Sequence, residues 1–185
     1  LEDNSITSDF YFIGSHLSDR QDVIIKFGQL AKKNSWKLDF NIICKEKDIP
    51  ELSREYAVID NIKVIGEIRE FQDNLKYICK AKVLIDFVTS DHSGLSFRVF
   101  EALGYEKKLI TTNAEVVHYD FYHPDNIFIW DGKNLNGIEE FLDKPYKPID
   151  PKIKQKYSFS NWIKYLLDIH PHQKLTLPRI PFESH

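Results

Sequence analysis

The stretch Val83-Leu84-Ile85-Asp86-Phe87-Val88 is almost continuously apolar, with one acidic residue in its interior. An apolar run of this length suits a buried strand, because helices in globular domains usually need ten or more residues. Strands that are apolar on both sides are typical of parallel sheets, where helices cover both faces. We therefore expect residues 83–88 to form a central strand of a parallel sheet.

On both sides of this strand, short apolar runs alternate with longer amphipathic stretches. Further strands are predicted at residues 9–13, 38–44, 62–65, 109–111 and 127–130, and helices at residues 20–34, 68–80, 94–103, 114–119 and 134–143. Such alternation predicts βαβ units, whose right-handed crossovers place helices on both faces of the sheet. The predicted fold class is α/β, a three-layer αβα Rossmann-like domain with a mostly parallel sheet of about six strands.

Residues 1–168 are expected to form this single domain, and residues 169–185 an extended C-terminal tail. The proline-rich residues 144–148 interrupt the alternation, and residues 160–168 then show the pattern of a terminal amphipathic helix. The tail holds three prolines, so His170 and His172 are expected to be exposed to solvent. The chain has no methionine, which is consistent with a domain whose N-terminal half lies elsewhere in a longer protein.

Composition and charge exclude several classes of protein. A net charge of -3 and a pI near 6.2 argue against a general nucleic-acid binder, so no such partner is expected. The sequence has no apolar run long enough to span a membrane and no signal-peptide pattern, which predicts a cytoplasmic location. Aromatic and basic residues of the tail leave open a peripheral contact with the inner face of a membrane. Cys44 and Cys79 are expected to be buried free thiols.

Three loops are placed to bind a ligand, because ligands of open α/β sheets lie beyond the carboxyl ends of the strands. They are residues 14–19, 89–94 and 112–114. Each loop leads into a helix whose free N–H groups and positive dipole end attract anions. The sequence therefore predicts a phosphate-binding site at this edge of the sheet.

Glu101 is the one acidic residue of the mostly apolar helical segment 97–103. A carboxylate in such a position is costly unless it is paired or bound to a ligand. Glu101 therefore either holds a ligand hydroxyl, or forms a structural contact by pairing with Arg98 or capping a neighbouring loop. For an isolated glutamate the structural contact is the favoured interpretation.

The block from Ser93 to Asn113 resembles the nucleotide-sugar-binding element of GT-B glycosyltransferases of the large retaining family. Ser93-Gly94-Leu95-Ser96-Phe97-Arg98-Val99-Phe100-Glu101-Ala102-Leu103-Gly104, followed by Leu109-Ile110-Thr111, aligns with that signature without a gap. The resemblance implies that Glu101 binds the ribose hydroxyls of the nucleotide. It also implies that the loop of Ser93, Gly94 and Leu95 approaches the donor's diphosphate and sugar.

Two other loops are also similar to this family. Gly14 and Arg20 resemble the family's strand glycine and its basic phosphate contact, and Ser15 lies beside them. Thr112 and Asn113 fall where the family places the donor or its base. The resemblance covers most of residues 9–168, but only the block from Ser93 to Asn113 is specific.

The sequence departs from the family pattern at four positions. Ser93 replaces the first glutamate, Ser15 an arginine, Glu106 a glycine and Lys108 a proline. The resemblance therefore carries over no stereochemical outcome, neither retaining nor inverting.

The role of Arg98 stays open between two contacts. It could grip the diphosphate through bidentate hydrogen bonds, or it could form an ion pair with Glu101, Glu106 or Asp91. The sequence favours neither.

No metal site and no cofactor are expected. His118, Asp120 and His123 do not have a recognised zinc spacing, and the absence of any Asp-x-Asp excludes the metal-dependent GT-A class. The missing Gly-x-Gly-x-x-Gly disfavours a dinucleotide-dependent dehydrogenase. Neutralisation of the leaving diphosphate then falls to helix dipoles and basic side chains.

These features predict an enzyme, specifically the donor-binding domain of a nucleotide-sugar-dependent glycosyltransferase, with its catalytic residues unknown. The expected partners are a nucleotide-diphosphate sugar, a glycan or lipid-linked acceptor such as lipopolysaccharide, and the N-terminal domain of the same protein. Alone, the chain is expected to bind nucleotide weakly and to transfer nothing. Two alternatives stay open: a non-catalytic nucleotide-binding or interaction domain, and a GT-B-like sugar-nucleotide epimerase.

Overall fold

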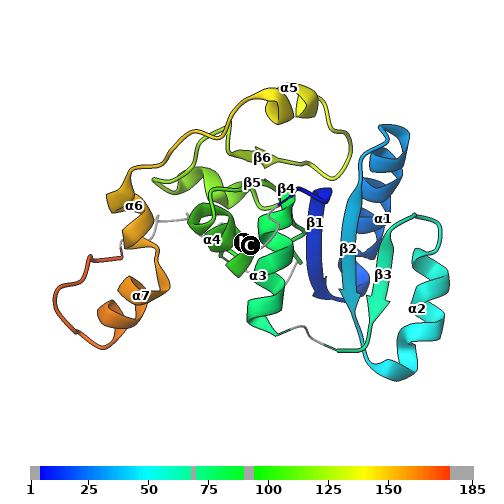
Figure 1. The fold of residues 1–185 in the computed structure, drawn as a ribbon, viewed down its shortest axis with the longest axis horizontal. Coiled ribbons are helices and arrows are strands. Elements are labelled where there is room, and N and C mark those ends of the chain that lie inside the picture. The colour runs from blue at the N-terminus through cyan, green and yellow to red at the C-terminus, as the bar shows by residue number, and fades with distance from the viewer. Residues whose placement is uncertain (1–4, 68–69, 90–93, 176–185) are drawn as a thin grey trace, which may run out of the picture.

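The computed structural model describes residues 5–67, 70–89 and 94–175, and in this part of the chain six strands form one sheet. Their order is β3-β2-β1-β4-β5-β6, and every neighbouring pair is parallel (Figure 1). The strands are β1 (Ser8–Ser15), β2 (Leu38–Ile43), β3 (Ile62–Ile65), β4 (Ala81–Asp86), β5 (Lys108–Thr111) and β6 (Ile127–Ile129). The predicted α/β class, the parallel sheet and all six strand positions are confirmed.

Seven α-helices and two short 3-10 helices lie between or after the strands in the described part of the chain. They are α1 (Ser18–Lys33), η1 (Glu46–Asp48), α2 (Ile49–Tyr56), α3 (Phe71–Lys80), α4 (Phe97–Gly104), η2 (Ala114–His118), α5 (Ile138–Asp143), α6 (Pro151–Lys156) and α7 (Phe159–Leu166). Buried side chains of α1, α2 and α5 belong to one hydrophobic cluster, and those of α3 and α4 to a second. The sheet therefore lies between two helical layers.

Phe27 of α1 lies at the centre of an aromatic group in the first cluster. Its ring centroid is 5.2 Å from that of Phe10, 5.8 Å from Phe40, 5.9 Å from Phe87 and 5.4 Å from Trp130. All five rings are almost completely removed from solvent. Aromatic pairs at these separations add to the free energy gained by burying their apolar area. This group fastens α1 to strands β1 and β2 and to the segments that follow β4 and β6.

Several helix predictions need correction. The helix expected at residues 94–103 begins only at Phe97, because Gly94 has φ +105°, a left-handed conformation that does not continue a helix. Helices α2 and α6 were not predicted. Cys44 and Cys79 are free thiols, as expected, but both are only partly buried.

The last two helices lie beyond the sheet on the side of α4, with α6 nearer to α4 and α7 farther out (Figure 1). Tyr157, at the end of α6, packs its ring 4.9 Å from that of Phe121 and 6.1 Å from that of Phe100. The core contacts of this region therefore come from α6. Among the described residues, no helix is long and apolar enough to cross a membrane.

Candidate functional site

The strand order reverses direction between β1 and β4, which makes the carboxyl ends of these two strands the place where such folds bind ligands. β1 ends at Gly14 and Ser15, and β4 ends at Asp86. The loops that follow lead into α1 and α4. The site predicted from the sequence therefore lies at the topological switch point of the sheet.

Arg20, in the first turns of α1, folds back over this point. Its guanidinium donates to the backbone carbonyl of Ser15 and, at 3.5 Å, to that of Phe87, so it bridges the ends of β1 and β4. Burial lowers the pKa of Arg20. Its Nε is buried and has no hydrogen-bond partner among the described residues. Arg20 is thus a partly desolvated cation beside the expected diphosphate position.

The close approach of Arg20 explains the glycine at position 14. A Cβ atom there would lie 2.9 Å from Nη2 of Arg20 and 2.9 Å from Cζ of Phe12. These separations are shorter than ordinary van der Waals contacts, so a larger residue would displace one of the two side chains. Gly14 therefore serves the packing of Arg20, and Ser15 contributes its carbonyl oxygen to it.

Asp86 organises the loop after β4, a role that the sequence analysis missed. Its carboxylate is buried and accepts hydrogen bonds from Ser96 Oγ at 2.8 Å and Thr111 Oγ1 at 2.8 Å. It thereby joins the end of β4 to β5 and to the residue before α4. The signal was present in the sequence, because a lone acid in an apolar strand must find partners.

Thr112 and Asn113 use their side chains to hold the neighbouring loops. Thr112 Oγ1 accepts from the Val88 N–H at 2.9 Å. Asn113 Nδ2 donates to the Gly94 carbonyl at 2.8 Å, and its Oδ1 caps η2 by accepting from the Glu115 N–H at 3.0 Å. These bonds fix the position of the Gly94 turn.

Helix α4 carries the two charged residues that the sequence analysis singled out. Arg98 Nη1 lies 2.5 Å from Glu101 Oε2, and the two side chains are only 11% and 16% exposed. The ion pair considered for Arg98 is therefore present. Arg98 also donates to the Ile13 carbonyl at 3.4 Å, which connects α4 to the end of β1.

Burial raises the pKa of Glu101 and the charge of Arg98 opposes this shift. Arg98 contacts only one of the two carboxylate oxygens, and Oε1 has no hydrogen-bond partner among the described residues. Glu101 thus forms a structural ion pair through Oε2, and this pair leaves Oε1 able to accept a hydrogen bond from a ligand.

The structure brings most of the predicted residues to one edge of the sheet. Arg20 and Arg98 both reach the backbone at the end of β1, one from each helical layer. Gly94 is tied to Asn113 beside them, and Leu95 packs on the cluster beneath α4. Ser93 and Asp91 lie outside the described residues, so the predictions that rest on them stay predictions.

Two departures from the family pattern have structural counterparts. Glu106, which replaces a glycine, has φ +53°, in the left-handed region that favours glycine. Lys108, which replaces a proline, is buried and donates from Nζ to the carbonyls of Phe141 and Leu142. Lys108 therefore ties β5 to α5.

A cleft that was not predicted from the sequence lies on the other side of β1 and has a volume of about 780 Å³. Its lining comes from the carboxyl ends of β1 to β3 and from α1, η1 and α2: Ser15, His16, Ser18, Gln21, Ile43, Cys44, Lys45, Asp48, Glu51, Leu52, Glu55 and Gly66. Three carboxylates and one lysine line this cleft, which we call the acidic cleft. Its excess of negative charge disfavours binding of a diphosphate.

Comparisons with known proteins identify the fold and no more. No family model matches the sequence, and no curated protein matches it. Among solved structures, the chain is similar to the C-terminal domain of a glycosyl transferase group 1 family protein from Francisella tularensis, with 14% identity, a TM-score of 0.51 and 75% of each chain covered. It is also similar to UDP-GlcNAc 2-epimerase from Neisseria meningitidis bound to UDP-GlcNAc, with 16% identity and a TM-score of 0.50. That match covers 91% of this chain and 44% of the epimerase.

These likenesses define the class of fold: a Rossmann-like domain of the kind found in GT-B proteins. This chain spans less than half of the epimerase chain. At such low identity the fold is shared, and function has to be argued from the site.

Proposed function

We propose that this chain is the donor-binding half of a GT-B glycosyltransferase and holds a nucleotide-diphosphate sugar at the switch point between β1 and β4. The observation that carries the proposal is the half-buried Glu101 on α4, whose Oε1 has no partner among the described residues. It lies on the helix that follows the loop at the end of β4, in the same fold as a glycosyl transferase domain.

Each residue has a role in this proposal. Glu101 accepts hydrogen bonds from the ribose hydroxyls. The amides of Gly94 and Leu95, together with that of Ser93, bind the diphosphate, because a left-handed residue such as Gly94 can present N–H groups to anions. Arg20 and Arg98 neutralise the charge that develops on the leaving diphosphate, so that transfer proceeds without a metal ion.

Thr112 and Asn113 act near the donor through the loops that they hold. Their hydrogen bonds fix the Gly94 turn before the ligand arrives, which reduces the ordering required on binding. Ser15 contributes through its carbonyl, which keeps Arg20 in place.

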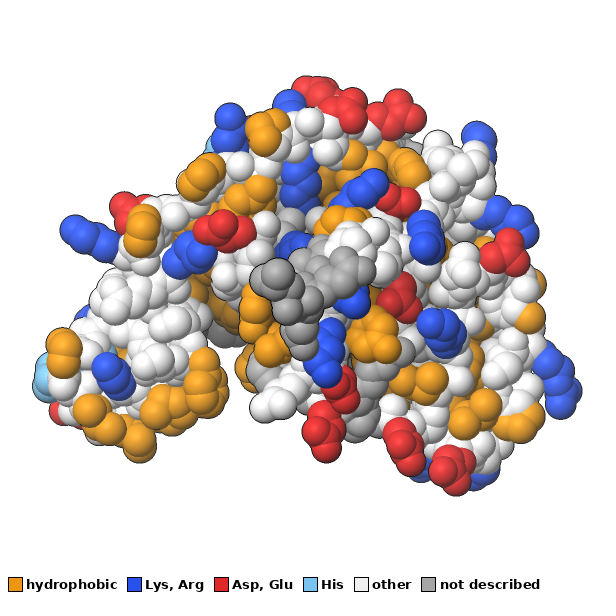
Figure 2. All heavy atoms as spheres, viewed as in Figure 1, with side chains coloured by type: hydrophobic (Ala, Val, Ile, Leu, Met, Phe, Trp, Pro, Cys, Tyr) orange, Lys and Arg blue, Asp and Glu red, His pale blue; other side chains and the backbone are white. Residues whose placement is uncertain are grey.

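A second half of the protein would supply the acceptor site and any catalytic base. The exposed apolar side chains of α7 suit a contact with it: Phe159, Trp162, Leu166 and Leu167, called the α7 stripe below. Figure 2 shows apolar side chains gathered at the end of the molecule that α7 forms. The buried residue of α7 is polar Asn161, so this helix presents its apolar face outward, the reverse of an ordinary surface helix.

Contact of the α7 stripe with the other half is measured by binding of this chain to the separately expressed upstream segment. We expect the Trp162→Ser substitution to abolish this binding. Binding of the chain to anionic vesicles, lost in the same variant, would instead assign the stripe to the membrane surface and a peripheral location.

Calorimetry with UDP, GDP and their sugars tests the donor-binding proposal. We expect weak binding of one nucleotide class, at one site per chain and without added metal. Nucleotide binding together with conversion of UDP-GlcNAc would favour the epimerase alternative, which the similarity to the solved epimerase supports. No binding of any nucleotide would contradict the proposal and leave an interaction domain.

A further inference from the structure

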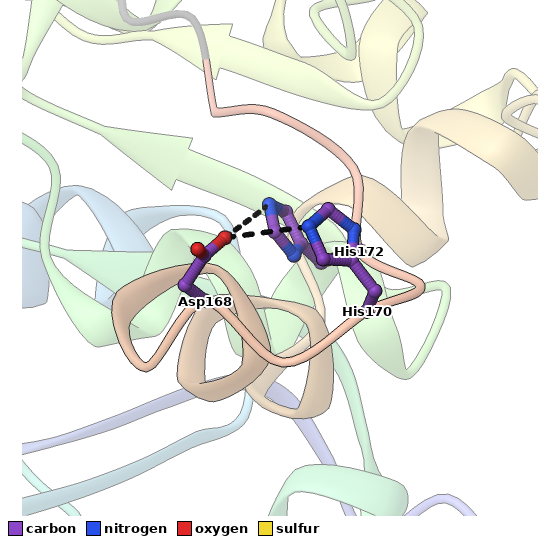
Figure 3. Close-up of side chains that lie close together, drawn as sticks. All are labelled: Asp168, His170 and His172. Carbon is purple, nitrogen blue, oxygen red and sulfur yellow. Dashed lines mark ion pairs between the residues drawn. The ribbon is translucent and has the colours of Figure 1, made fainter.

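Three side chains with metal-binding atoms converge where α7 ends. Asp168, His170 and His172 each offer one ligand atom, and these atoms all lie within 4.8 Å of one another (Figure 3). The sequence analysis expected both histidines to be exposed. His170 is, but the side chain of His172 is only 12% exposed.

The two separations between the Asp168 carboxylate and the histidine nitrogens are close to those in a tetrahedral site. Asp168 Oδ1 lies 3.4 Å from His170 Nε2 and 3.9 Å from His172 Nε2. In a tetrahedral zinc site with bonds of about 2.0–2.2 Å, neighbouring ligand atoms are about 3.3–3.6 Å apart. The separation from His170 already has this length. The separation from His172 needs only a small rotation of the exposed Asp168 side chain to reach it.

A backbone contact favours the tautomer of His172 that a metal ion requires. Its Nδ1 lies 3.3 Å from the Ile169 carbonyl oxygen, which can only accept, so this nitrogen carries the proton. Nε2, the atom facing Asp168, then has the free lone pair. A ligating histidine commonly donates its other N–H in this way, which fixes both ring orientation and tautomer. The ring also packs edge-on against Tyr165, with centroids 5.5 Å apart.

The backbone that carries these residues is held on both sides. The Ile169 and Asp168 N–H groups donate to the carbonyls of Lys164 and Tyr165, which closes α7 with a Schellman motif. Asp168 has φ +53°, a position where glycine is usual. Beyond the histidines, the Gln173 N–H donates to the buried Asn161 side chain at 2.7 Å. The backbone that carries the three ligands is thus positioned before an ion binds.

We propose that Asp168, His170 and His172 form a Zn²⁺ site, with solvent in the fourth position. Two imidazoles and a carboxylate are ligands that zinc accepts in tetrahedral geometry. The ion joins the turn after α7 to the first residues of the tail and holds residues 168–172 against the helix. This site is independent of the nucleotide site.

Zinc titration of the chain without an affinity tag, near neutral pH, tests the proposal by calorimetry, with Co²⁺ absorption as a second readout. We expect one ion per chain and the intense visible bands of tetrahedral Co²⁺. His172→Ala and Asp168→Asn should each weaken binding at least about tenfold, because loss of a direct ligand exceeds the 10- to 100-fold cost of losing a supporting contact. Acidification should release the ion, because protonated imidazoles do not ligate.

His118→Ala is the matched control, since His118 is also exposed and lies beside a carboxylate, Glu115, at 3.9 Å. Zinc affinity should be unchanged in this variant. The site would be disproved by absence of binding, by octahedral Co²⁺ spectra, or by equal affinity in the wild-type and His172→Ala chains. Any of these results would leave the three side chains as surface ion pairs, which contribute little to stability.

Discussion

Replacement of Phe27 with alanine is expected to lower the free energy of unfolding by about 3–5 kcal/mol, the range for removing a buried phenylalanine ring. Phe27 has no exposed surface and packs against four other buried aromatic rings that connect α1 to the sheet. The four surrounding rings cannot readily fill the space that the ring leaves, because they are fixed on different strands and loops. Urea denaturation followed by circular dichroism measures the change.

Phe159→Ala is the control for this prediction. Phe159 lies on α7 with 72% of its surface exposed, so its removal should change the stability by less than about 0.5 kcal/mol. If Phe27→Ala cost no more than Phe159→Ala, the aromatic group around α1 would not be the main connection between helix and sheet.

Replacement of Glu101 with glutamine is expected to weaken nucleotide binding about 10- to 100-fold. A hydrogen bond to a charged group contributes about 1.5–3 kcal/mol, and each 1.4 kcal/mol corresponds to a factor of ten. Glutamine has nearly the same shape, and its single oxygen can still accept a hydrogen bond from Arg98, but an NH2 group that only donates then replaces the Oε1 acceptor. Calorimetry with the nucleotide that the wild-type chain binds provides the measurement.

Glu139→Gln on α5 is the matched control, because Glu139 is exposed and belongs to the opposite helical layer. Its affinity should equal that of the wild-type chain. If Glu101→Gln lost stability while keeping full nucleotide affinity, Glu101 would be the structural partner of Arg98 and nothing more.

The strands could be predicted from the sequence because each is a short apolar run ended by a glycine or polar residue. The residues 83–88 are the clearest case, and β4 lies between β1 and β5 as a central strand should. Helix α2 was missed because its eight residues have only two buried side chains, Leu52 and Tyr56. These two residues are about one helical turn apart, and a single turn is too short to reveal a helical period in the sequence.

The candidate site was predictable where its charged side chains lie close together in one segment of the sequence. Glu101 and Arg98 share a helix, and the sequence allowed the ion pair that the structure shows. Asp86 and the acidic cleft depend on contacts between loops distant in the chain, which local patterns do not contain. The three possible zinc ligands lie close in sequence, but only the turn after α7 makes their atoms converge.

An NMR titration of the ¹⁵N-labelled chain with UDP- and GDP-sugars locates the bound nucleotide and so distinguishes the switch point from the acidic cleft. We expect the largest amide shifts at Gly94, Leu95 and Arg98, where α4 approaches the ends of β1 and β4. Shifts confined to the acidic cleft, at Asp48 and Glu51, would contradict it. Absence of shifts with every nucleotide sugar would equally contradict a donor site at the switch point.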